Sequence, residues 1–138
     1  MNDLNRFTEA QETDYATALA EIRRGRKQSH WMWYIFPQIA GLGFSSTSKF
    51  YAIKDRAEAE NYLAHPVLGK RLIEISTALL EIEGKIASQV FGSPDDVKLK
   101  SSMTLFGALD DTNPVFQTVL DKYFGGAKDQ RTLELIDV

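Results

Sequence analysis

The sequence predicts an all-α fold, a compact single domain of several helices that covers residues 1–138. Three observations lead to this prediction. Apolar residues recur at spacings of three and four along several segments, as on one face of a helix. Proline and capping residues stand where such segments begin, and glycine stands where several of them end. The length is that of one ordinary domain, and no linker, repeat or low-complexity segment divides the chain.

The first predicted helix runs from Phe7 to Ile22, with a break near Thr13 left open. Its apolar residues share one stripe, and the run stops at Gly25. Residues 39–48 are rich in glycine and serine and are predicted to form a loop, in which Gly41-Leu42-Gly43 makes a turn and could act as a flexible lid.

Two helices are predicted in the middle of the chain. Asp55 caps the first in a pattern that resembles a capping box with Glu58, and this helix ends before Pro66. Pro66 suits the first turn of the second helix, which continues to Gly84. The second helix carries the most regular apolar stripe of the chain: Leu68, Leu72, Ile75, Leu79 and Ile82.

Three further helices are predicted in the last third. Ser93-Pro94 begins one, with two aspartates in its first turn, where carboxylates interact favourably with the helix dipole. Asn113-Pro114 begins the next, which ends at Gly125-Gly126. A short helix from about Gln130 to Ile136 closes the chain.

Composition narrows the range of functions. The chain has a net charge of -3 and is 43% hydrophobic, as in an ordinary globular protein, so binding to nucleic acid is not expected. Cysteine is absent and there are only two histidines, which excludes thiolate chemistry and His-rich metal sites; we expect no metal and no cofactor. The polar N-terminal residues lack the apolar core of a signal peptide, and no apolar run approaches the ~20 residues that cross a bilayer. We therefore expect a cytoplasmic protein.

The segment from Gly25 to Gly43, GRKQSHWMWYIFPQIAGLG, is the first candidate for a site. His30 and Tyr34 share a face, because a spacing of four fits both helix and strand, and Lys27 joins them if the segment is helical. In the functional interpretation the aromatic rings stack on a planar ligand, His30 exchanges a proton, Lys27 holds an anionic group and Gln38 contacts an amide-like edge.

The structural interpretation of the same segment stays open beside the functional one. In it Trp31, Trp33 and Phe36 belong to the core, and a backbone carbonyl satisfies His30. A helix here would end at about Ile35, because proline disfavours helical angles at the residue before it.

The helix after Pro94 supplies the second candidate. Lys98 and Ser102 fall on its apolar arc, whereas Lys100, Ser101 and Thr104 fall on the opposite side. Either Lys98 and Ser102 offer donors to a phosphate or carboxylate in a pocket, or Lys98 extends its ammonium to water and Ser102 is satisfied locally.

A family resemblance rests on blocks spread over the whole chain. The most specific is HWMWYIFPQ, residues 30–38, accompanied by GLG at 41–43, YAI at 51–53, FG at 91–92 and SSMTLF at 101–106. These residues resemble the domain-of-unknown-function 1810 family. The resemblance implies a compact, mostly helical, cytoplasmic protein of bacterial type and no established catalytic residue. Chain size and the content of aromatic, Lys and Gln residues are also distantly similar to those of the NADAR N-glycosidases, which handle ADP-ribose conjugates.

The predicted site joins the two candidates. We expect ligand-binding roles for Lys27, His30, Tyr34, Gln38, Lys98 and Ser102. The expected ligand is a small anion, nucleotide-like or ADP-ribose-like. Whether the protein is an enzyme stays open: no known catalytic signature is present, although His30 could act with Asp96 or Asp129 if they lie close in space. The alternative is a non-catalytic protein-interaction module in which the aromatic residues form core.

Overall fold

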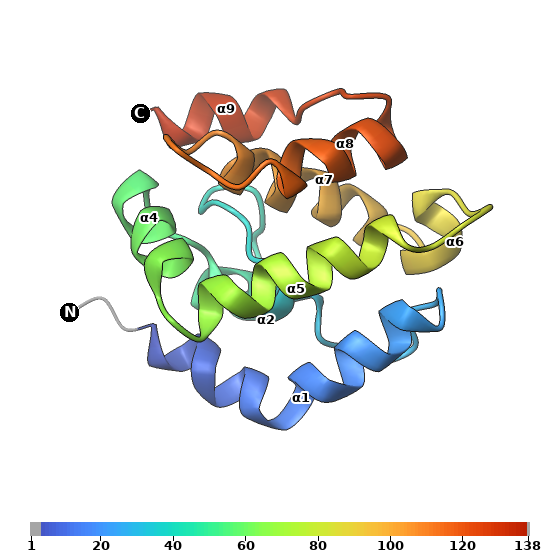
Figure 1. Cartoon of the computed structure of the whole chain (residues 1–138). Coiled ribbons are helices and arrows are strands. Elements are labelled where there is room, and N and C mark those ends of the chain that lie inside the picture. Colours follow the sequence, from blue (N-terminus) through green and yellow to red (C-terminus); the bar gives the residue numbers. More distant parts are fainter. Residues whose placement is uncertain (1–3, 138) are drawn as a thin grey trace.

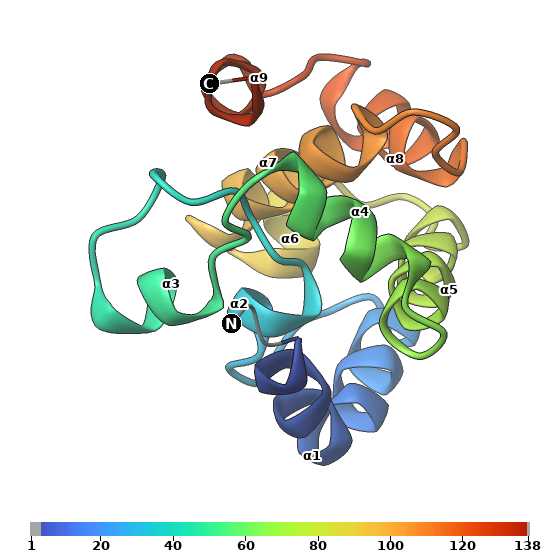
Figure 2. The same cartoon turned by 90° about the vertical axis from the view of Figure 1, so that its left-hand side faces the viewer.

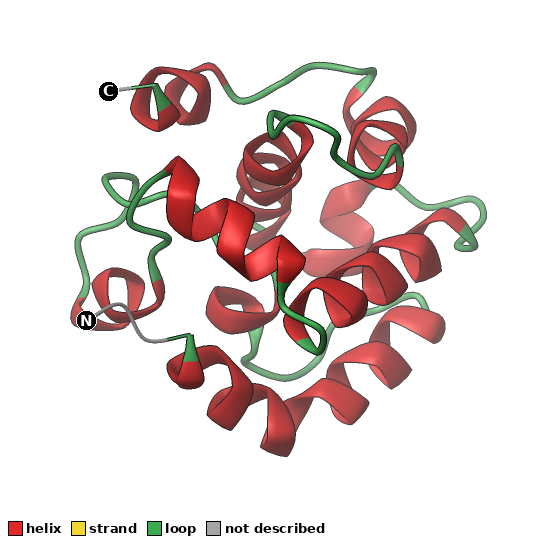
Figure 3. Cartoon of the chain, turned by 60° about the vertical axis from the view of Figure 1, so that its left-hand side comes forward, coloured by secondary structure: helices red, strands yellow, loops and turns green. Residues whose placement is uncertain are grey.

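The computed structural model describes residues 4–137 and confirms the all-α fold (Figure 1). Within these residues there are nine helices and no strand (Figure 3). A single parallel bridge, between Ile39 and Ile53, joins the two ends of the segment that contains the third helix. The helices are α1 (Asn5–Arg23), α2 (Met32–Ile35), α3 (Ser46–Tyr51), α4 (Arg56–Ala64), α5 (Leu68–Leu80), α6 (Ala87–Phe91), α7 (Asp95–Gly107), α8 (Val115–Phe124) and α9 (Gln130–Ile136).

Helices α5 and α7 lie at the centre of the molecule. α5 packs between α1 and α8, and α7 contacts α4, α6, α8 and α9 (Figure 1). Aromatic rings link these layers, because Phe106 of α7 lies 5.3 Å from the Tyr62 ring of α4 and 5.9 Å from the Phe116 ring of α8, measured between centroids. One continuous hydrophobic core results.

Asp55 caps α4 as the sequence predicts, and Asp129 caps α9, a role that the sequence did not indicate. The side chain of Asp55 accepts a hydrogen bond from the backbone N–H of Glu58 at 2.9 Å. Asp129 does the same for the N–H of Thr132 at 3.0 Å and so begins α9. α8 ends at Gly125, whose φ of 62° lies in the left-handed region that glycine adopts without strain.

Two predicted boundaries are wrong and one further helix was missed. The loop expected over residues 39–48 ends early, because Ser45 caps α3 by accepting from the N–H of Ser48 at 3.1 Å. α6 was not expected from the sequence. α5 begins after Pro66 and ends at Leu80, short of Gly84. The unexpected helices have six and five residues, too few for a periodic pattern to identify them.

The segment around α3 stands out from the rest of the molecule, on the side away from α5 (Figure 2). α3 contacts α2 and buries only Ser48 among its residues. Of the helices described, none is both long enough and apolar enough to cross a bilayer.

Candidate functional site

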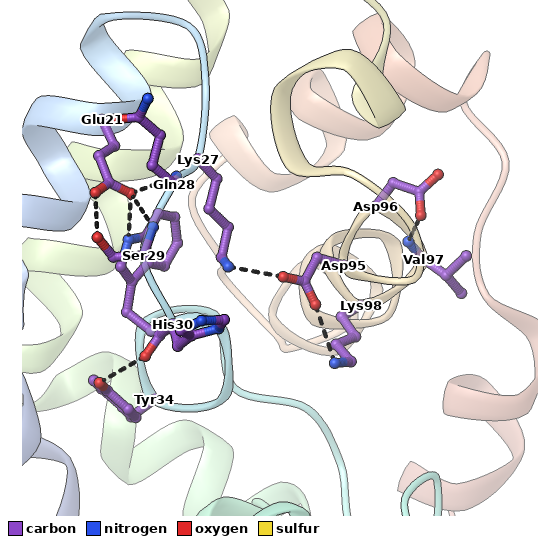
Figure 4. Close-up of polar contacts among 11 residues, drawn as sticks. Glu21, Lys27, Gln28, Ser29, His30, Tyr34, Asp95, Asp96, Val97 and Lys98 are labelled. Atoms are coloured by element: carbon purple, nitrogen blue, oxygen red, sulfur yellow. Dashed lines mark hydrogen bonds and ion pairs between the residues drawn. The ribbon is translucent and has the colours of Figure 1, made fainter.

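The carboxylate of Glu21, near the end of α1, holds the first part of the aromatic segment in place. It accepts hydrogen bonds from the backbone N–H groups of Gln28 and Ser29, at 2.8 and 2.9 Å, from the Ser29 hydroxyl at 2.6 Å and from the Trp31 indole at 2.9 Å (Figure 4). Burial raises the pKa of Glu21, but these hydrogen bonds outweigh burial and lower the pKa to about 2. The segment before α2 is therefore ordered by a buried anion and is not helical.

Lys27 and Lys98 converge on one carboxylate, that of Asp95. The Nζ of Lys27 lies 2.9 Å from one oxygen of Asp95, and the Nζ of Lys98 lies 3.0 Å from the other. Figure 4 shows the two ammonium groups directed at this carboxylate from two separate segments. Burial raises the pKa of Asp95, but the two lysines outweigh burial and lower it. Together the three groups carry a surplus of one positive charge.

Each of these lysines also lies over a tryptophan ring. The Nζ of Lys27 is 5.1 Å from the ring centroid of Trp31, and the Nζ of Lys98 is 4.1 Å from that of Trp33. The two rings differ in burial: Trp31 is fully buried in the core, whereas Trp33 is only partly buried. The structural interpretation is therefore right for Trp31 and wrong for Trp33.

Trp33 borders two adjoining cavities. The α7 cavity, of about 240 Å³, lies against the start of that helix; the loop cavity, of about 120 Å³, lies under residues 39–43 and α3. Trp33, Gln38, Leu42 and Gly43 line both. The α7 cavity is completed by Pro94, Val97, Lys98, Ser101 and Asp129. The loop cavity is completed by Ile39, Ala40, Gly41, Ser48, Lys49, Tyr51 and Ala52.

The wall that the two cavities share carries polar groups without partners. Among the residues that the structure describes, no side chain or carbonyl pairs with the indole N–H of Trp33 or with the side-chain amide of Gln38. The fold keeps Gln38 in place through its backbone, whose carbonyl accepts from the N–H of Ile53 at 2.8 Å. An indole donor and an amide that can both donate and accept are thus available to a ligand.

Of the predicted site residues, Gln38 and Lys98 line the cavities, and Lys27 joins Lys98 through Asp95. His30 lies at the surface beside this group and lines neither cavity. Lys27 was expected on the face of His30 only if the segment were helical, and this condition is not met, since α2 begins only at Met32.

Tyr34 and Ser102 line neither cavity. The Tyr34 hydroxyl donates to Asp14 of α1 and lies 3.2 Å from the carbonyl oxygen of His30; burial first, and then the bond to Asp14, raises the pKa of Tyr34. Ser102 is fully buried on the inner face of α7, as its position on the apolar arc predicts, but among the described residues its hydroxyl has no hydrogen-bond partner. The structure therefore separates both side chains from the group around Lys98.

Sequence reasoning placed Ser101 and Thr104 on the polar side of α7, and the structure corrects this. Both are buried, because α9 packs on that face. Asp129, the N-cap of α9, thereby lines the α7 cavity. Its carboxylate accepts a hydrogen bond from the Ser101 hydroxyl at 3.4 Å. The sequence did not show that α9 packs on α7, so it could not connect Asp129 with Ser101. No cluster of three or more side chains suited to a metal is found within the described residues.

Comparisons with known proteins agree with this fold. The model of a family described as a protein of unknown function, DUF1810, matches residues 1–136. The chain is similar to the conserved hypothetical protein Rv1873 from Mycobacterium tuberculosis, whose crystal structure it matches with a TM-score of 0.96. The two sequences are 46% identical, and the match covers 99% of this chain and 97% of that chain. No curated protein matches the chain significantly.

Proposed function

The chain belongs to the DUF1810 family, and we propose that it binds a small organic anion with a planar group, a nucleotide or an ADP-ribose-like molecule, in the two cavities beside Trp33. One observation carries the proposal. Lys98, half of a lysine pair that shares a single carboxylate, lies 4.1 Å above the ring of Trp33 at the wall of the α7 cavity. We place this activity in the cytoplasm, as the cysteine-free sequence suggests.

The anionic group of the ligand occupies the α7 cavity at the end marked by Lys98. The Lys27 side chain is only 8% exposed and that of Lys98 22%, so their charges are partly withdrawn from water and attract an anion more strongly than surface lysines do. Asp95 neutralises one of the two, and a phosphate or carboxylate would complete the pairing of the other.

The planar group of the ligand occupies the loop cavity. Lys98 does not line this cavity, so a ring can pack against Trp33 there without displacing the ammonium group. The loop cavity, of roughly 120 Å³, is smaller than the cavity of about 150 Å³ that holds benzene, so a larger ring would also occupy part of the adjoining α7 cavity, of about 240 Å³. The Gln38 amide borders the same space and suits the polar edge of a nucleobase.

A pair of matched lysine substitutions tests the proposal. We expect AMP and ADP-ribose to raise the melting temperature of the wild-type protein, and uncharged adenosine to have a much smaller effect. Lys98→Met should weaken AMP binding at least about tenfold in isothermal titration calorimetry, because a charged hydrogen bond contributes roughly 1.5–3 kcal/mol. Lys100→Met on the same helix, whose side chain lines neither cavity, is the control. Equal affinities in the two variants, or no response to either nucleotide, would contradict the proposal.

A protein-interaction module is the alternative. Phe44, Phe50 and Val97 are 87%, 58% and 55% exposed and stand near the cavities, which favours a docking surface. In that case Phe44→Ser should abolish association with the partner and leave the melting temperature unchanged. Under the nucleotide proposal, Phe44→Ser should leave the preference for AMP over uncharged adenosine unchanged.

A further inference from the structure

The inference deepens the proposed function and rests on it. We infer that the ligand carries a vicinal diol, as ribose does, and that Asp129 and Ser101 bind its hydroxyl groups in the α7 cavity. Both residues line this cavity, as does Lys98. The site would thus recognise a sugar phosphate joined to a planar group.

Asp129 is held rigidly and keeps part of its acceptor capacity free. Its backbone N–H donates to the Thr104 hydroxyl at 2.9 Å. One carboxylate oxygen, Oδ2, accepts from the N–H of Thr132 at 3.0 Å, from the Thr132 hydroxyl and from the Ser101 hydroxyl at 3.4 Å. Among the described residues nothing donates to the other oxygen, Oδ1. A carboxylate offers about four acceptor sites, so at least one oxygen is available to a ligand.

Ser101 has more acceptors than it can serve. Its hydroxyl oxygen lies 3.3 Å from the carbonyl of Val97 and 3.4 Å from Asp129, and it has only one proton to donate to them. Its lone pairs accept from no described residue. Ser101 and Asp129 therefore form a part of the cavity wall that has a surplus of acceptors.

A surplus of acceptors calls for a ligand that supplies donors. A phosphate is excluded from this end because the carboxylate of Asp129 would repel it, so the anion belongs at the Lys98 end. An ammonium group is disfavoured by the surplus charge of Lys27 and Lys98 nearby. Two adjacent hydroxyl groups fit best, since each can donate to Asp129 or Ser101 and also accept the Ser101 proton.

The experiment compares AMP with 2′,3′-dideoxy-AMP, which has the same base and phosphate but lacks both hydroxyls. Dissociation constants are measured by calorimetry for the wild-type protein, Asp129→Asn, Ser101→Ala and Asp55→Asn. Asparagine caps helices about as well as aspartate, so Asp129→Asn preserves α9. Asp55→Asn is the matched control, since Asp55 caps α4 in the same way and lines neither cavity.

We expect AMP to bind the wild-type protein at least about tenfold more tightly than the dideoxy compound. Asp129→Asn and Ser101→Ala should each reduce this preference, mainly by lowering the affinity for AMP. Asp55→Asn should leave the preference unchanged. If both nucleotides bind the wild-type protein equally, the diol inference is overturned and the proposed function stands. The diol inference is also overturned if Asp129→Asn raises the dissociation constants of both nucleotides by the same factor. If neither nucleotide binds, the proposed function falls together with the inference.

Discussion

At the residue scale, Glu21 links stability to the shape of the site. Glu21 is 2% exposed, and its carboxylate accepts four hydrogen bonds from the segment that carries Lys27 and leads into α2. Protonation would remove the charge on which these bonds depend. The position of Lys27 beside Asp95 therefore depends on an ionised group in a neighbouring helix.

The lowered pKa of Glu21 predicts a specific loss of stability in acid. The folded-state pKa of about 2 lies below the ordinary value of 4.5, so the contribution is present above pH 4.5 and is lost as the pH falls towards 2. At roughly 1.36 kcal/mol for each unit, the contribution is about 3 kcal/mol. Urea unfolding measured between pH 7 and pH 2.5 gives the free energy of unfolding of the wild-type protein and of Glu21→Gln. The difference between these two free energies should shrink as the pH falls. The surface variant Glu83→Gln should follow the wild-type curve, and a constant difference for Glu21→Gln would contradict the prediction.

The sequence predicted some of the residues that line the candidate site and missed others for a physical reason. Gln38 and Lys98 were identified because a polar group next to aromatic or apolar positions needs an explanation, and both line the cavities. Trp31 and Trp33 could not be told apart, because spacing alone does not show which ring meets the core. Ser101 and Asp129 were missed as a pair, because their contact depends on how α9 packs against α7.

At the element scale, the structure confirms the longer helices that the sequence predicts, whether periodicity, a cap or a proline indicated them. Helices α1, α4, α5, α7, α8 and α9 were all predicted. The short helices α3 and α6 were not, since a helix of one or two turns depends on its surroundings more than on its own residues. Caps located the helix beginnings better than glycines located the ends, as α5 shows by stopping at Leu80.

The junction of α4 and α5 predicts a strict requirement for glycine at position 69. A Cβ atom there would lie 1.9 Å from the carbonyl oxygen of Leu63, a backbone atom that cannot move aside without shifting α4. We expect Gly69→Ala to reduce the free energy of unfolding by about 3 kcal/mol, the upper part of the usual range for overpacking. The control is Gly107→Ala in α7, where the nearest atom outside the helix, the Cβ of Phe116, is 3.5 Å away. That variant should be unchanged or up to about 1 kcal/mol more stable, and equal effects in urea unfolding would contradict the prediction.

At the scale of the whole molecule, the two cavities lie between parts that are buried to different degrees, from which we expect unequal local stability. One wall is α7, which is embedded in the core and contacts four other helices. The other is the loop with α3, which stands out from the body (Figure 2). Within α3 only Ser48 is buried. Gly43 keeps the loop close to α3, since a Cβ there would lie 2.6 Å from the Ser48 side chain. A ligand between the two walls would tie the less stable part to the more stable one.

This inequality predicts the pattern of hydrogen exchange. Amides of α5, α7 and α8 should exchange only on global unfolding, because their buried faces form the continuous core. Amides of Ser46–Tyr51 should exchange many times faster, since α3 can open locally without exposing that core. Exchange followed by mass spectrometry measures both groups in one experiment. Adding AMP at about 100 times its dissociation constant stabilises the bound state by about 2.7 kcal/mol and should slow exchange in residues 41–51 by up to about a hundredfold. Equal protection of α3 and α7 without ligand would contradict the proposed difference in stability, and unchanged exchange in residues 41–51 with AMP bound would show that the ligand does not use the loop cavity.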